Sequence, residues 1–283
     1  MSSSTKPLRF PGFSNSMLIL GLMFLYLPML ILMIYSFNSS QLVTVWAGFS
    51  TYWYGELFQD KQLMNALWIS FRIAFYTASM AVVLGTIGAF VLARFGRFKG
   101  RTGFSSMLTA PLVMPDVITG LALLLLFVTT ADLFGWPADR GVITIWIAHV
   151  TFSTAYVAVV VGARLTELDT SIEEAALDLG ATPLKAFFQI TIPTIAPALA
   201  SGWLLAFTLS LDDLVIASFV SGPGATTLPM VVFSSVRLGV SPKINALATL
   251  IILVVSLATL IGWWLMRRAE KNRRKYLHSY HQE

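Results

Sequence analysis

Six long apolar segments limit what this chain can fold into more than any other feature of its sequence. A helix rises about 1.5 Å per residue, so about 20 residues are needed to cross a hydrocarbon layer roughly 30 Å thick. The segments are long enough, and they lie near residues 17–37, 65–93, 105–130, 142–162, 194–220 and 246–266. The sequence therefore predicts an all-α, polytopic membrane protein with six transmembrane helices.

The composition excludes an ordinary soluble protein. Of the 283 residues, 56% are hydrophobic and only 12% are charged, whereas soluble domains carry about 25% charged residues. Cysteine is absent, which excludes disulfides, thiolate metal sites and cysteine nucleophiles. The formal net charge is +5, but the basic residues cluster beside the apolar segments, so they indicate membrane topology rather than a nucleic-acid partner.

The basic residues are divided unequally between the two sets of connecting loops. Fourteen lie in the tail 1–16, the loop after the second segment, the loop 163–193 and the tail 267–283, whereas four lie in the opposite loops. Cytoplasmic loops of membrane proteins carry the excess of Lys and Arg. We therefore expect both termini in the cytoplasm, with the two tails flanking a transmembrane domain of residues 17–266.

The loop 163–193 has a helical pattern of its own. Thr170 or Ser171 can cap a helix, because Glu173 or Glu174 follows at the spacing of a capping box. Gly180 is placed to end this helix in a left-handed conformation, and a second short helix is expected directly after it. The apolar stripe of the first helix consists of Ile172, Ala175, Ala176 and Leu179. Taken alone, the helix pair is either a long linker or a docking element for another protein.

The spacing of residues in this loop resembles the EAA loop of the permeases of ABC importers. The matching residues are Glu174, Ala175, Ala176, Gly180, Ile190 and Pro193, with Ile192 where the family usually has leucine. The resemblance implies a type I ABC importer permease fold with both termini in the cytoplasm. It also implies that these residues form a coupling helix, which seats in a groove of a separate ATPase subunit.

Three further segments extend the resemblance to nearly the whole chain. Residues 110–120, 209–219 and 221–229 are similar to the polyamine-importing branch of the family, and more narrowly to a permease subunit of the putrescine importer of Gram-negative bacteria. The resemblance implies a polyamine substrate and a location in the bacterial inner membrane, in contact with lipid. The partners it implies are a second, homologous permease subunit, two ATP-binding subunits and a periplasmic polyamine-binding protein.

Three acidic residues lie inside predicted membrane segments, where a carboxylate costs several kcal/mol unless it meets a partner or water. Asp116 lies about 16 Å along the third segment, and Asp212 and Asp213 lie about 27 Å along the fifth. These residues are candidates for lining a path for a cation. Neighbouring helical residues point about 100° apart, so Asp212 and Asp213 face one pore only if the helix is broken there.

Each of these aspartates also has a structural alternative. Asp116 follows a proline and can cap a half-helix that restarts after it. Asp212 and Asp213 can bond to a neighbouring span or to the second permease subunit, and Arg72 can either snorkel outward or pair with Asp213. His149, in the fourth segment, is expected to be a packed, hydrogen-bonded histidine rather than a proton relay.

A turn at Gly222, Pro223 and Gly224 is expected on the opposite side of the membrane from the termini. The apolar residues after it, between residues 230 and 236, predict a short helix in or near the membrane interface. This segment is a candidate outer gate. The alternative is a helix that only seals the bundle.

The sequence also bears on function classes other than an ABC permease. It has no stretch of Gly, four residues and Gly-Lys-Ser/Thr, so no cofactor is expected on this chain, and ATP and Mg are expected on the partner ATPase. A self-sufficient secondary transporter or channel for small organic cations is the alternative, which inverted repeats would favour. An enzyme is not expected, because two of the three histidines lie in the terminal tail and no catalytic set converges.

Overall fold

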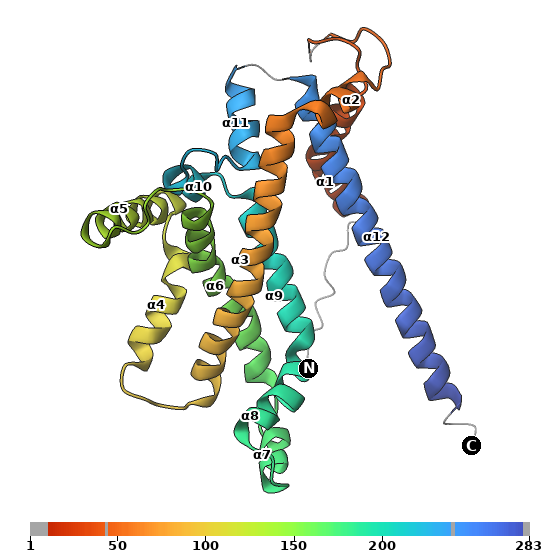
Figure 1. Cartoon of the computed structure of the whole chain (residues 1–283). Coiled ribbons are helices and arrows are strands. Elements are labelled where there is room, and N and C mark those ends of the chain that lie inside the picture. Colours follow the sequence, from red (N-terminus) through yellow and green to blue (C-terminus); the bar gives the residue numbers. More distant parts are fainter. Residues whose placement is uncertain (1–10, 43–44, 239–240, 280–283) are drawn as a thin grey trace, which may run out of the picture. The chain divides into compact units, whose positions relative to one another are not determined.

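The computed structural model describes residues 11–42, 45–238 and 241–279, which are mostly helical (Figure 1). Backbone contacts divide the chain into two compact units, Lys61–Ser234 and the combination of Met1–Asp60 with Ser235–Glu283. The larger unit contains α3 (Lys61–Arg94), α4 (Arg101–Val113), α5 (Asp116–Phe134), α6 (Val142–Glu167), α7 (Ser171–Asp178), α8 (Pro183–Ala186), the π-helix η1 (Phe187–Thr191), α9 (Ile192–Asp212) and α10 (Val215–Val220). The smaller unit contains α1 (Pro11–Tyr35), α2 (Tyr52–Gln59) and α12 (Pro242–Ser279), and α11 (Leu228–Leu238) crosses the boundary between the units.

Six helical segments of the described chain are long and apolar enough to cross a membrane. The all-α class and the number of membrane helices predicted from the sequence are thereby confirmed. The third predicted segment, 105–130, falls on two helices, α4 and α5, with the chain extended at Met114 and Pro115 between them. Proline disfavours helical geometry in the residue before it, which explains why the helix ends at this point.

Helices α3, α6 and α9 form the core of the larger unit. Their interface depends on small residues, because Val157 of α6 inserts between Gly85 of α3 and Gly202 of α9. Small residues at helix crossings allow close backbone approach, which is the main source of packing energy between membrane helices. Buried residues of the same three helices surround this contact, namely Ala78, Ala81, Ala89, Val161, Leu165, Ile195 and Ala206.

A second apolar cluster holds α5 and α10 against α6. Helix α10 packs on α5 and on α6, and Phe127 and Ile216 are buried between these helices. Gly120 of α5 lies against the Phe219 ring and the Ile216 backbone, where a Cβ atom would come within 2.7 Å of that ring. Figure 1 shows α5 and α10 near one end of the larger unit and α7 and α8 at the other end.

The smaller unit is held by contacts of α12 with α1 and α2. Buried polar groups connect the segment after α1 to α2: the Trp53 indole donates a hydrogen bond to the Asn38 carbonyl at 2.8 Å. Lys243 at the start of α12 lies 3.4 Å from a carboxylate oxygen of Asp60 and 3.7 Å from one of Glu56. Polar contacts therefore define the ends of these helices.

We predict that Gly85→Ala destabilises the bundle. The added Cβ atom would lie 2.8 Å from Val157 Cγ1 and 3.0 Å from the Ala158 backbone nitrogen, and overpacking of this kind costs about 1–3 kcal/mol. Gly103→Ala is the matched control, because Gly103 lies in helix α4 with no neighbouring atom within 4 Å of the added Cβ. The measurement is the thermal unfolding midpoint in detergent, and equal midpoints for the two variants would contradict the packing described for Val157.

Candidate functional site

The fifth predicted membrane segment is broken at its two aspartates. Helix α9 ends at Asp212, Asp213 is extended with φ −66° and ψ 123°, and α10 starts at Val215. The sequence allowed both carboxylates to face one pore only if the helix is interrupted, and the structure meets this condition. Both aspartates line the same cavity.

Asp213 stabilises this break. Its carboxylate accepts hydrogen bonds from the backbone N–H groups of Ile216 at 3.3 Å and Ala217 at 2.7 Å, so it caps the N-terminus of α10. The same carboxylate lies 3.1 Å from Nε2 of His149, whose Nδ1 lies 2.7 Å from the Ser210 hydroxyl. His149 is 1% exposed, which confirms the expectation of a packed, hydrogen-bonded histidine.

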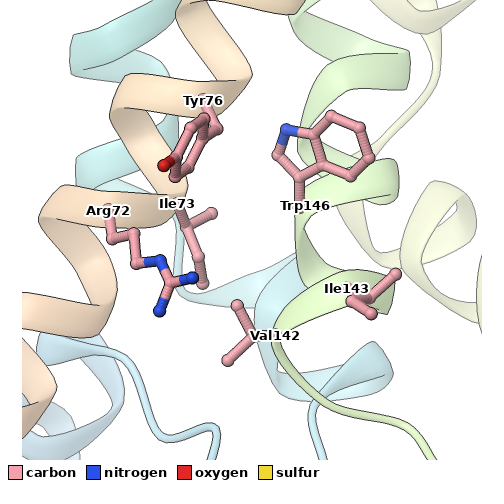
Figure 2. A pocket seen from close by; sticks show the side chains of 6 residues that line it. All are labelled: Arg72, Ile73, Tyr76, Val142, Ile143 and Trp146. Carbon is pink, nitrogen blue, oxygen red and sulfur yellow. The ribbon is translucent and has the colours of Figure 1, made fainter.

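The proposed pairing of Arg72 with Asp213 is wrong. The partner of Asp213 is His149, while Arg72 borders a different cavity of about 270 Å³ between α3 and α6. Figure 2 shows Arg72 and Tyr76 on α3 and Trp146 on the facing helix around this space. Since the partner of a side chain in a bundle depends on helix rotation, spacing along the sequence did not identify it.

The three intramembrane aspartates come together although they belong to separate predicted segments. Asp116, Asp212 and Asp213 line one cavity of about 290 Å³. Asp116 is the first residue of α5, and within the described chain no backbone N–H donates to its carboxylate, so the capping alternative for Asp116 is not supported. Its carboxylate is therefore available to a ligand in the cavity.

Aromatic residues complete this cavity, and the sequence did not single them out. Phe152 and Tyr156 of α6 line it together with Thr119 of α5. They follow His149 at positions i+3 and i+7, so they share one face of α6, and this spacing was the signal that was available. The described lining residues include no Lys, Arg or His, so the cavity combines negative charge with aromatic surface, a combination that suits organic cations.

The helix pair in the loop 163–193 is present as predicted, with its turn at Gly180. Gly180 has φ +88°, and the N–H of Ala181 donates to the Ala176 carbonyl at 3.0 Å, which closes the C-terminus of α7. The second helix begins at Pro183, and the Thr182 hydroxyl accepts a hydrogen bond from the Lys185 N–H at 3.4 Å. The left-handed glycine and the cap predicted at Thr182 are confirmed.

The predicted capping box at the start of α7 is wrong. Thr170 makes no side-chain cap, and the Ser171 N–H donates instead to the Asp169 carboxylate at 3.0 Å. This backbone hydrogen bond lowers the pKa of Asp169. Glu173 pairs instead with Arg94 at the end of α3, so a tertiary contact replaced the local one.

The outer surface of this helix pair is apolar and open. Glu174 and Ala175 are exposed, and Leu179 is 89% exposed and Leu184 72% exposed. Of the remaining residues that the sequence assigned to the EAA loop, Ala176 and Ile190 are half-buried and Pro193, in the first turn of α9, is exposed. An open apolar surface of this kind at the end of a bundle is typical of a protein-docking site.

The segment from Gly222 to Gly224 forms the expected turn, and α11 is the expected short helix. Gly224 has φ +74°, and a Cβ atom on Gly222 would overlap the carbonyl oxygen of Arg140. The turn therefore packs against the chain just before α6, and Thr144 in the first turn of α6 donates to the Val220 carbonyl at 2.7 Å. The turn is thus fixed to the helix that carries His149.

Comparison with known proteins identifies the class. Residues 81–275 match the model of the family described as "Binding-protein-dependent transport system inner membrane component". The chain is 71% identical to the putrescine transport system permease protein PotI of Escherichia coli (strain K12) over 256 residues, or 90% of this chain and 91% of that protein. It is 40% identical to the spermidine/putrescine transport system permease protein PotC of the same organism over 245 residues, or 87% of this chain and 90% of that protein.

Solved structures agree on the fold. The chain is similar to a chain of a bacterial ABC transporter involved in the import of the acidic polysaccharide alginate, with a TM-score of 0.71, 19% identity, and coverage of 93% of this chain and 99% of that chain. A broken-helix bundle with an exposed loop helix is thus the architecture of an ABC importer permease. The chain belongs to the family of binding-protein-dependent transport system inner membrane components, which confirms the resemblance and decides against a self-sufficient transporter or channel.

We predict that Asp213→Ala destabilises the protein. The substitution would leave His149 and two N–H groups of α10 without their acceptor, and losing such a buried partner costs about 1–3 kcal/mol. Asp132→Ala is the matched control, because Asp132 is an exposed aspartate of α5. Thermal unfolding midpoints in detergent provide the comparison. A midpoint for Asp213→Ala equal to that of the parent would show that this carboxylate does not hold the break.

Proposed function

We propose that this chain is one of two permease subunits of an ATP-driven importer that takes up polyamine, most directly putrescine, across the bacterial inner membrane. The observation that carries the proposal is the cavity lined by Asp116, Asp212 and Asp213 without a basic side chain among its described lining residues. Two relatives that cover most of the chain are described as permeases of putrescine and of spermidine/putrescine transport systems. The charge of the cavity and the names of the relatives support the same substrate class.

The physical reason is charge complementarity at a membrane-embedded site. A diammonium ion loses its water shell when it enters a membrane protein, and carboxylates compensate for that loss. The rings of Phe152 and Tyr156 add a cation–π contribution beside the carboxylates. Fold alone would not specify this substrate, because the transporter with a similar fold imports an acidic polysaccharide by its own description.

Energy is supplied by other chains in this proposal. Two ATP-binding subunits carry ATP and Mg, and they dock on the exposed helix pair around Glu174 and Gly180, with both termini of this chain in the cytoplasm. A homologous second permease faces the cavity, and a periplasmic polyamine-binding protein delivers substrate near the turn at Gly222–Gly224, the proposed outer gate. A solved alginate transporter with a similar fold (TM-score 0.66, 16% identity, covering 88% of this chain and 90% of that chain) is in complex with a periplasmic protein. The excess of basic residues in one set of loops supports the cytoplasmic location of both termini.

Uptake measured with the complete transporter tests the substrate class. Proteoliposomes with the binding protein and ATP are expected to accumulate radiolabelled putrescine, because the negatively charged cavity favours ions with two or more ammonium groups. A neutral sugar and a dicarboxylate are the controls, and neither is expected to accumulate. Preference for the dicarboxylate, or accumulation of putrescine without ATP, would contradict the proposal.

Charge removal in the cavity tests the pathway. We predict that Asp212→Asn and Asp116→Asn each lower putrescine uptake about tenfold while the complex still assembles, since asparagine keeps the shape and removes the charge. Asp132→Asn, on an exposed position of α5, is the control and is expected to transport normally. Complex yield and uptake are measured together, and normal uptake in both cavity variants would show that the carboxylates are not needed for movement.

A further inference from the structure

The helix α7 is attached to the larger unit by a polar contact rather than by a buried apolar face. It has eight residues, and none of them is buried. A helix this short gains little stability from its own hydrogen bonds, so its position depends on its neighbours. Within the described chain, Glu173 is the only side chain of α7 that forms a hydrogen bond or ion pair with another element.

The Glu173 carboxylate joins three elements. Its Oε2 lies 3.0 Å from Nε of Arg94, the last residue of α3, and Arg94 Nη2 donates to Oε1 at 3.2 Å. The hydroxyl of Thr191, the last residue of η1, donates to Oε1 at 2.9 Å. The side chains of Arg94 and Glu173 are only 13% and 19% exposed, and Thr191 is 2% exposed. Because water is largely excluded, this charge-assisted contact is stronger than a surface ion pair.

The neighbouring glutamate lies in a different environment. Glu174 is exposed and has no partner among the described residues of this chain, so it remains available to another protein. Without Glu173, α7 would be linked to the following helices mainly through the backbone around Gly180. That glycine has φ +88°, and no atom lies within 4 Å of its Cβ position. Nothing packs against it to fix the angle between α7 and α8.

We propose that Glu173 is a positioning residue that, with Arg94 and Thr191, transmits displacement of α7 to α3 and α9. The inference rests on the proposed function in one respect, namely that α7 docks on the ATPase. Helix α9 continues directly from η1 and runs about 30 Å to Asp212 at the carboxylate cavity. The contact therefore places the docking helix and the cavity at the two ends of one element.

The test uses the complete transporter with its second permease, ATPase subunits and binding protein. Glu173→Gln is expected to assemble and to hydrolyse ATP, but the amount of putrescine imported per ATP should fall about fivefold, because α7 moves without carrying α3 and α9 with it. Glu167→Gln is the matched control: it removes an ion pair with Arg164 at which the two side chains are 45% and 69% exposed, and its ratio should not change.

A second variant separates positioning from folding. Thr191→Val keeps the ion pair but removes the hydroxyl donor to Glu173, so it should lower the same ratio by a smaller factor at normal complex yield. Exchanging the charges, Arg94→Glu with Glu173→Arg, should restore part of the ratio that Glu173→Gln loses. If both Glu173→Gln and Thr191→Val merely fail to assemble, the contact is structural and the proposal is overturned.

Distance measurements give a readout that does not depend on turnover. The chain has no cysteine, so spin labels at Asp178→Cys on α7 and Arg97→Cys after α3 need no background substitution in this chain. The parent transporter should show a narrow distance distribution, and Glu173→Gln should broaden it. An unchanged distribution together with an unchanged import ratio would overturn the proposal.

Variants at the docking surface distinguish this failure from failure of the proposed function. Glu174→Gln and Gly180→Val are expected to weaken copurification of the ATPase, since they alter the exposed acid and the left-handed turn. If both variants bind the ATPase normally and couple normally, docking on α7 is wrong, and the role proposed for Glu173 is wrong as well. If they weaken ATPase binding while Glu173→Gln couples normally, only the role proposed for Glu173 is wrong.

Discussion

The capping of α10 by Asp213 is the interaction on which the carboxylate cavity depends. A helix break inside a membrane leaves backbone N–H groups unpaired, and each unsatisfied group costs several kcal/mol where water is absent. Asp213 pairs with two of these groups and with the buried ring of His149. The break between α9 and α10 is therefore stable, and it allows Asp212 to border the same cavity as Asp116 of α5.

Helix α9 extends from the contact with α7 to the carboxylate cavity. Helix α9 ends at the cavity and begins at η1, where Thr191 bonds to Glu173 of the docking helix. Packing of Val157 between Gly85 and Gly202 holds α3, α6 and α9 close together. Polar contacts near both ends of α9 thus connect the exposed surface of α7 with the carboxylate cavity.

Local signals in the sequence predicted much of this arrangement. Apolar length predicted six membrane helices, and the position of Gly180 predicted a left-handed turn, because both depend on a few adjacent residues. The pairings of Asp213 and Glu173 were not predictable in this way. Their partners lie 64 and 79 residues away in the sequence, and which side chains meet depends on helix rotation in the bundle. The expected capping box at Glu173 failed for this reason: an arginine on another helix was the better partner.

The location of the substrate amines in the assembled transporter tests the central claim most directly. A structure of the complete complex, trapped during transport with putrescine bound, would show them. The account predicts one ammonium group within about 4 Å of the Asp212 or Asp116 carboxylate, with Asp213 still bonded to His149 and to the start of α10. Putrescine bound away from this cavity, or bound to Asp213 with the contact to His149 broken, would contradict it.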